Sequence, residues 1–387
     1  MENFVYNTPT KLIFGKGAVK NLPEVLKPLG NRILLTYGGG SIKKIGLYDK
    51  VKDLLSDFEI YELGGIEPNP KYSTSVLSGV KLCKEHNIDA VLAVGGGSVL
   101  DCSKAICAGA LYDGEPWDLI SYKVKAKAAL PLVDILTLAA TGSEYDSGCV
   151  ISRTETNDKV GYLDEHLFPY ASILDPEYTF SVSKKQTAAG AADAINHIME
   201  QYFCEKHSDL ADGMCESAIK SLIKNAKVAL SEPDNYDARA EFMVDCSLAC
   251  NGILSIGNSY SGWPCHGIEH ALSAYYDITH GEGLAIITPR WMKHILNDKT
   301  IERFVSFGTH IFGIDPSLPE SEIAEKTIDS VYKLFESFGM PMNLKNVGID
   351  EEKIDEMAAH IADNEGLDNA WAPLSQKDIA EILTDSL

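Results

Sequence analysis

The sequence predicts a two-domain protein, with an N-terminal α/β domain built on a parallel sheet and an all-α C-terminal domain. Three observations predict this. The chain has 387 residues, which is long for one domain. Short apolar runs alternate with amphipathic segments in its first half, and long helical patterns dominate after residue 182. We therefore expect one domain over 1–182 and a second over 183–387.

Three short apolar runs predict buried strands of the first domain. They span 31–37, 89–95 and 130–138, and they consist largely of β-branched and aliphatic residues bounded by glycine or polar residues. The segments 48–58 and 73–87 between them have helical spacing. Strands that alternate with helices are typical of a parallel sheet covered by helices.

Long helices are expected to begin near Ser181 and Ser183, where a serine side chain can cap the first of them. Strand-like runs become rare from this point, which predicts a helical second domain. An N-terminal stretch, 4–14, has strand-like β-branched and aromatic content.

The composition is that of a soluble globular protein, with 45% hydrophobic and 23% charged residues. A formal net charge of −22 argues against nucleic acid or an anionic membrane as a partner, because both attract positive surfaces. No signal peptide and no apolar run of membrane-spanning length is evident. The nine cysteines are scattered without a CxxC pair, which indicates free thiols and a cytoplasmic protein.

Two glycine loops follow predicted strands, GGGS at 38–41 and GGGS at 95–98. Glycine lets the backbone approach a ligand, and the free N–H groups of a following helix favour a diphosphate. We expect Ser98 to cap that helix and Lys104 to add positive charge. The GxGxxG fingerprint is absent, so two tight turns without a ligand are the alternative. A third loop, 136–144, ends another strand, and together the three favour a ligand at one sheet edge.

The residues after the strand 33–37 favour NADP(H) over NAD. NAD sites commonly place a carboxylate there to bind the ribose 2′-hydroxyl. Here Gly38–Gly40 and Ser41 follow, and then Lys43 and Lys44. This stretch contains no carboxylate, so it has no negative charge to repel the 2′-phosphate of NADP(H).

Histidines and one aspartate form two helical pairs. Asp193 and His197 are four residues apart, as are His266 and His270, and residues at that spacing share one helix face. His280 follows beside two glycines. Such a donor set, free of cysteine, suits Fe(II) or Zn(II) in a catalytic role. Ordinary polar histidines are the alternative, and spacing does not decide which of the last three histidines bind a metal.

Several motifs together resemble the iron-containing (group III) alcohol dehydrogenase family. They are IFGKGA at 13–18, PNP at 68–70, GGGSxxDxxK at 95–104, TGSE at 141–144, LDP at 174–176, DAxxHxxExY at 193–202 and HGxxHxLxxxxxxxHGxG at 266–283. The last two are the most specific. In detail the sequence resembles the NADPH-dependent butanol dehydrogenase branch, which includes broad-range aldehyde reductases.

The resemblance implies a dinucleotide-binding α/β domain, a helical metal-binding domain and an active site between them. It implies that Asp193, His197, His266 and His280 bind the metal and that His270 takes part in proton transfer or substrate positioning. The cofactor contacts that it implies are Gly38, Gly39, Ser41, Asn69, Gly96, Gly97, Ser98, Thr137, Thr141, Lys159 and Tyr178. Glu200 is either a partner of the metal ligands or a surface carboxylate.

The expected activity is metal-dependent interconversion of short-chain aldehydes and primary alcohols, with a small aldehyde or alcohol as substrate and a homodimer as the expected assembly. A metal- and NAD-dependent lyase of the dehydroquinate-synthase type is the alternative. Such an enzyme needs basic residues for a phosphorylated substrate, and between Lys227 and Arg290 the sequence contains no lysine and no arginine other than Arg239. A non-catalytic metal- or nucleotide-binding protein is the third possibility.

Overall fold

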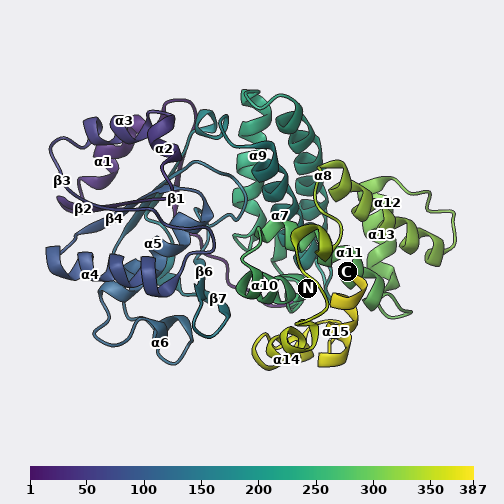
Figure 1. The fold of residues 1–387 in the computed structure, drawn as a ribbon. Coiled ribbons are helices and arrows are strands. Elements are labelled where there is room, and N and C mark those ends of the chain that lie inside the picture. Colours follow the sequence, from purple (N-terminus) through teal and green to yellow (C-terminus); the bar gives the residue numbers. More distant parts are fainter. The chain divides into compact units, whose positions relative to one another are not determined.

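The computed structural model describes all 387 residues, which form two compact units (Figure 1). The α/β unit comprises residues 7–182 and 232–251, and the helical unit comprises 1–6, 183–231 and 252–387. The chain passes from the α/β unit to the helical unit after residue 182. The segment 232–251, which the sequence places in the second domain, belongs to the α/β unit by its contacts.

A six-stranded parallel sheet forms the centre of the α/β unit, which confirms the predicted fold class (Figure 1). Its order is β1-β8-β5-β4-β2-β3. The strands are β1 (Lys11–Phe14), β2 (Arg32–Tyr37), β3 (Glu59–Gly64), β4 (Ala90–Gly95), β5 (Leu132–Leu136) and β8 (Ala171–Leu174), and a separate antiparallel hairpin consists of β6 (Gly148–Arg153) and β7 (Asp158–Leu163).

Helices cover both faces of this sheet, with α1–α3 on one face and α4 and α5 on the other (Figure 1). The helices of the unit are α1 (Leu22–Leu26), α2 (Ser41–Lys44), α3 (Leu47–Leu54), α4 (Leu77–His86), α5 (Gly97–Ala110), α6 (Trp117–Ile120) and α9 (Tyr236–Ala249), with short turns η1 (Ala18–Asn21), η2 (Tyr72–Val76), η3 (Glu165–Leu167) and η4 (Pro176–Thr179). Every residue of the central strand β4 is buried, because both of its faces are covered.

The two glycine loops lie side by side in this topology. β2 pairs with β3 on one side and with β4 on the other, so the direction of chain progression reverses between β2 and β4. Residues 38–41 follow β2, and residues 95–98 begin at the last residue of β4. Open α/β sheets bind ligands at the carboxyl ends of strands at such a switch point.

Helix α9 is tied to the α/β unit by buried contacts. The Ser247 hydroxyl donates a hydrogen bond to the buried Glu144 carboxylate. A Cβ atom on Gly142, whose φ is +74°, would come within 2.9 Å of the Cys246 carbonyl oxygen. The 141–144 loop therefore packs directly on α9.

The helical unit contains α7 (Lys184–Tyr202), α8 (Asp209–Ser231), α10 (Pro264–Tyr276), α11 (His280–Ile295), α12 (Ile301–Phe312), α13 (Glu320–Ser337), α14 (Ile354–Asn364) and α15 (Gln376–Asp385), with turns η5 (Ile253–Ser255), η6 (Leu344–Val347) and η7 (Leu367–Asn369). Ser183 caps α7 as predicted, since its hydroxyl accepts from the Gln186 N–H at 3.2 Å. Every residue of α7 from Thr187 to Tyr202 is buried, which makes it the central helix of the unit.

The N-terminal stretch 4–14 forms a shorter strand than the sequence suggests. Only Lys11–Phe14 is a strand, and it lies at the sheet edge beside β8. All nine cysteines carry free thiols, and eight are buried. None of the helices combines the length and the apolar character that crossing a membrane requires.

Candidate active site

The helical unit brings all four predicted metal ligands together. One donor atom each from Asp193, His266 and His280 lies within 4.8 Å of the others. The Asp193 Oδ1 atom is 3.2 Å from His197 Nε2, 3.8 Å from His266 Nε2 and 3.5 Å from His280 Nε2. The His197 ring stacks on the His266 ring, with 4.8 Å between centroids. Three imidazoles thus surround one carboxylate oxygen.

Unsatisfied buried atoms show that this cluster fits a metal ion. Asp193 Oδ1 and His266 Nε2 are buried and have no hydrogen-bond partner. Buried polar atoms nearly always have one, so such orphans require an explanation. A divalent cation at the centre of the cluster would satisfy both, and one carboxylate with imidazoles is a donor set that Zn(II) and Fe(II) accept.

The protonation states of Asp193 and His197 also suit metal binding. Burial raises the pKa of Asp193, but His197, His280 and His266 outweigh it and hold the pKa well below its usual range. Burial lowers the pKa of His197 to about 3, so its imidazole is neutral. For His266, burial lowers the pKa, but Glu200 and Asp193 raise it more, to about 9. Metal binding at His266 would therefore release a proton.

A glycine explains how His280 reaches α7. His280 is the first residue of α11, and Gly281 follows it. A Cβ atom on Gly281 would lie 2.1 Å from the Ala189 carbonyl oxygen on α7. Because only glycine permits this approach, α11 begins close to Asp193. In the HG pair of the motif, the histidine therefore supplies the donor atom, and the glycine permits the close helix approach that places it.

His270 lies on α10 one turn after His266 but outside the three-donor cluster. Its ring centroid is 6.0 Å from that of His280, and its buried Nδ1 is 3.7 Å from Glu365 Oε1. This placement leaves the ring beside the cluster, next to a carboxylate. Its proton-transfer role stays a prediction.

Trp263 forms an aromatic wall of the cluster. Its ring centroid is 5.1 Å from that of His266 and 5.9 Å from that of His197. Its φ of +49° is uncommon for a bulky side chain, and such conformations often mark functional sites. Pro264 then begins α10 directly.

Two carboxylates behind the cluster are functional candidates, and spacing does not predict the second of them, Glu269. Glu200 is buried and hydrogen-bonded to His266 Nδ1, which excludes the surface alternative for this residue. Glu269 is also buried and is bonded to His280 Nδ1. Glu269 and His280 are eleven residues apart, on different helices, so no helical spacing connects them.

The second and third loops of the α/β unit, which follow the neighbouring strands β4 and β5, pack together. The Thr137 N–H donates to the Gly95 carbonyl at 2.8 Å. A Cβ atom on Gly97 would lie 2.5 Å from the Thr141 side chain. α5 begins at Gly97 with Gly96 at the N-cap, so the expectation that Ser98 caps it is wrong. Ser98 instead lies in the first turn of α5. The N–H groups of Gly97 and Ser98 precede the first helical hydrogen bonds, which Val99 and Leu100 donate to the Gly96 carbonyl, and such N–H groups suit a diphosphate.

Lys104 does not supply charge to the loop, contrary to expectation. Its side chain is fully buried, and Nζ donates to the Asp146 carboxylate at 2.7 Å and to the carbonyl oxygens of Asp146 and Gly148. Asp101, one turn earlier, accepts from the Ser143 hydroxyl at 2.7 Å and the Val150 N–H at 3.0 Å. Both residues anchor the segment that follows the third loop to α5.

One carboxylate, Glu62, contacts Tyr37, the residue that precedes the glycine loop 38–41. Glu62 on β3 accepts hydrogen bonds from the hydroxyls of Tyr37 and Tyr48 and pairs with Lys52 at 2.8 Å. Lys43 Nζ lies 4.9 Å and 4.7 Å from the two tyrosine ring centroids. The Glu62 carboxylate thus already has hydrogen-bond and ion-pair partners, and Lys43 lies close to the two tyrosines that contact it.

The other predicted cofactor residues have diverse surroundings. Asn69 has a left-handed backbone, with φ +48°. Lys159 is buried on β7 opposite Ser152, so it is not a solvated loop lysine. The Tyr178 hydroxyl accepts from Lys50 Nζ at 3.1 Å, and the ring packs against the apolar core of the sheet. Their contacts with a cofactor, like those of Gly38, Gly39 and Ser41, stay predictions.

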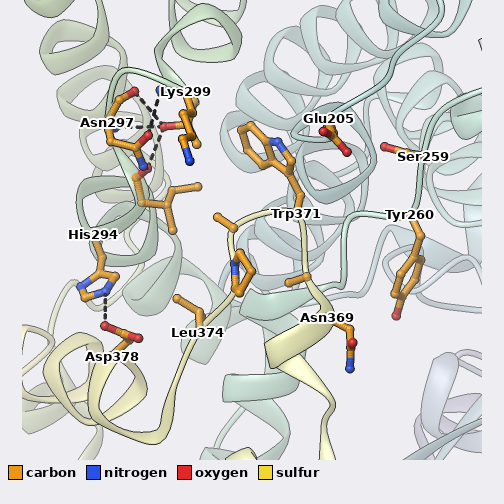
Figure 2. Close-up of a pocket in the computed structure, with 15 residues that line it drawn as sticks. Glu205, Ser259, Tyr260, His294, Asn297, Lys299, Asn369, Trp371, Leu374 and Asp378 are labelled. Atoms are coloured by element: carbon orange, nitrogen blue, oxygen red, sulfur yellow. Dashed lines mark hydrogen bonds and ion pairs between the residues drawn. The ribbon is translucent and has the colours of Figure 1, made fainter.

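The helical unit also contains a cavity of about 630 Å³ that includes none of the predicted ligands (Figure 2). Trp371, Tyr260 and Leu374 contribute to its lining, and His294 Nε2 is 3.2 Å from Asp378 Oδ1 at one side. The cavity is therefore separate from the donor set of the metal cluster.

Comparison with known proteins identifies the family. The model of the iron-containing alcohol dehydrogenases matches residues 9–176, and the model of the C-terminal domain of the same family matches residues 187–387. The chain therefore belongs to the iron-containing alcohol dehydrogenase family. It is an oxidoreductase that interconverts alcohols and aldehydes, and its family implies a divalent metal and a nicotinamide cofactor.

Individual relatives match along most or all of the chain. NADH-dependent butanol dehydrogenase A of Clostridium acetobutylicum is 46% identical over 390 residues, with 100% of both chains covered. The NADPH-dependent aldehyde reductase YqhD of Escherichia coli is 38% identical, with 92% of this chain and 91% of the relative covered. The crystal structure of NADH-dependent butanol dehydrogenase A of Thermotoga maritima has a TM-score of 0.95 at 39% identity and covers 100% of this chain and 99% of its own.

Proposed function

We propose that the protein is a metal-dependent aldehyde reductase that converts short-chain aldehydes such as butanal to primary alcohols with NADPH. The observation that carries the proposal is the cluster in which Asp193, His266 and His280 converge within 4.8 Å. His197 would be the fourth ligand, 3.2 Å from Asp193 Oδ1. Fe(II) or Zn(II) would supply Lewis-acid polarisation of the carbonyl, and the nicotinamide would supply the hydride.

The residues around the cluster have distinct proposed tasks. Trp263 supplies an apolar wall that excludes water and suits a short aliphatic chain. His270 passes a proton to the reduced oxygen, because an imidazole beside the cluster can act as a general acid. Residues 96–98 hold the cofactor diphosphate through the first turn of α5, and Thr137 and Thr141 continue that path.

The proposed preference for NADPH rests on charge at the end of β2. Residues 38–41 carry no carboxylate, and Lys43 lies next to them. The carboxylate of Glu62 is occupied by two tyrosine hydroxyls and Lys52. The relatives are named for both cofactors, NADH for the clostridial enzyme and NADPH for the E. coli enzyme.

Initial rates of butanal reduction by metal-replete protein, with NADPH and NADH side by side, test the proposal. We expect rapid oxidation of NADPH and weak use of NADH. Equal rates would retain the enzyme class and refute the cofactor argument. If metal is bound and neither cofactor is oxidised, the aldehyde substrate is wrong. Protein with His266→Ala is the matched control, because it should lose metal and activity together.

A further inference from the structure

Two buried carboxylates lie directly behind two of the proposed ligands. Glu200 on α7 is 1% exposed, and its Oε2 is hydrogen-bonded to His266 Nδ1. Glu269 on α10 is 0% exposed, and its Oε2 is hydrogen-bonded to His280 Nδ1. In both cases the opposite ring nitrogen, Nε2, faces Asp193.

A second contact fixes each carboxylate. The Cys265 N–H donates to Glu200 Oε1 at 2.6 Å. The Ser273 hydroxyl donates to Glu269 Oε1. A Cβ atom on Gly283 would lie 2.7 Å from Glu269 Cγ, so the second glycine of the HGEG motif leaves room for this side chain. Both carboxylates are therefore held from two sides and have little freedom to move.

The chemistry of imidazole gives this arrangement a consequence. In a neutral imidazole, a carboxylate that accepts the hydrogen of Nδ1 leaves the lone pair on Nε2, the nitrogen that can then bind a metal. The same hydrogen bond fixes the ring orientation and increases the electron density on Nε2. Burying a carboxylate is costly unless it is paired, and here the histidine ring is the partner of each.

We propose that Glu200 and Glu269 are positioning residues that hold His266 and His280 in the metal-binding tautomer and orientation. The inference rests on the proposed metal centre, which it extends beyond the four ligands. His197 has no such partner, because its Nδ1 is buried without a hydrogen bond. The two positioning carboxylates therefore act on two specific ligands rather than on the cluster as a whole.

Metal affinity tests the proposal without relying on activity. Full-length protein is freed of metal with a chelator, and Zn(II) affinity is measured by competition with a chromophoric chelator. Co(II) is used in parallel, because its visible absorption reports coordination geometry. The variants are Glu200→Gln and Glu269→Gln, which keep the side-chain shape and remove the charge. Glu282→Gln is the matched control, since Glu282 is a buried carboxylate on α11 that pairs with Lys185 at 2.9 Å.

We expect each of Glu200→Gln and Glu269→Gln to weaken Zn(II) binding by about 10- to 100-fold and to alter the Co(II) spectrum, with Glu282→Gln unchanged. Ser273→Ala, which removes the hydroxyl that anchors Glu269 and leaves the carboxylate itself in place, should weaken binding by a smaller factor and keeps the test open if a Gln variant misfolds. The positioning role would be overturned if folded Gln variants bound Zn(II) with wild-type affinity and gave the wild-type Co(II) spectrum. If a Gln variant misfolds, the same result for Ser273→Ala would overturn it. Failure of the wild-type protein itself to bind Zn(II) or Co(II) would instead refute the metal centre.

Discussion

The histidines of the cluster differ in what stands behind each ring. Glu200 contacts His266, and Glu269 contacts His280. Glu365 Oε1 is 3.7 Å from His270 Nδ1. His197 has no partner at Nδ1. At the scale of single residues, the groups that contact each ring distinguish the proposed ligands from the proposed proton carrier more clearly than the positions of the histidines in the motif do.

His270→Ala should lower kcat by about 10²- to 10⁴-fold, because it removes the proposed proton carrier. Bound metal should remain, since His270 lies outside the donor cluster. Steady-state kinetics and metal analysis of the same preparation check both. His360→Ala is the control, because that ring packs on Tyr275 with 5.9 Å between centroids. Loss of metal from the His270 variant would contradict the assigned role.

Local spacing predicted the proximity of Asp193 and His197, because residues four apart share a helix face. It gave no information on Glu269, which meets His280 only after two helices pack. Lys104 failed as a prediction for a similar reason. Its position near a glycine loop suggests an anion contact, but its acceptors come from the segment 146–148, which the fold brings to α5.

At the scale of elements, apolar character decided which strands could be predicted. β2, β4 and β5 are buried and were found within a few residues of their limits. β3 alternates between exposed and half-buried residues, and β8 has only four residues. Such strands resemble loops in sequence. Assignment of α9 to the α/β unit depends on contacts with Gly142 and Glu144, which are distant in sequence.

One element contact has a defined dependence on pH. Asp89, just before β4, accepts from the Asn31 and Arg32 N–H groups at 3.0 Å and 2.9 Å and from the Arg32 guanidinium at 2.8 Å. The Arg32 hydrogen bond is the main cause that lowers the pKa of Asp89 to about 2. A lowered carboxyl pKa stabilises the folded state above the unfolded value, near 3.9, and this stabilisation is lost as pH falls toward 2.

Asp89→Asn should therefore lower the free energy of unfolding of the α/β unit by about 1 kcal/mol at pH 7, allowing for partial exposure of the pair. The difference from wild type should persist down to about pH 4 and shrink below it. Urea unfolding at pH 7, 4 and 3 measures this. Asp57→Asn, at an exposed position, is the control. If the difference in the free energy of unfolding between wild type and Asp89→Asn grew on acidification, the assigned direction of the pKa shift would be wrong.

At the scale of the whole molecule, the N-terminal residues present unpaired apolar surface. β1 is an edge strand with only β8 beside it. Phe4 and Val5, a few residues earlier, are 52% and 98% exposed. Exposed edges with apolar side chains favour pairing with another chain. We propose that two copies associate through residues 4–14.

Light scattering should give a mass of twice the 42.2 kDa of one chain. Val5→Glu should shift the protein toward the single-chain mass, because it places charge in the paired surface. Leu163→Glu, at another exposed apolar position, should leave the mass unchanged. A single-chain mass for the wild-type protein at micromolar concentration would refute the association.

The membership of α9 in the α/β unit matters for recombining this protein with its relatives. A chimera that exchanges cofactor specificity at a crossover after residue 182 would combine Glu144 of one parent with Ser247 of the other and would place a foreign helix under Gly142. Parents that differ at these positions would yield inactive hybrids for reasons unrelated to the cofactor. Exchange of residues 7–182 together with 232–251 transfers the whole α/β unit and keeps its internal contacts within one parent.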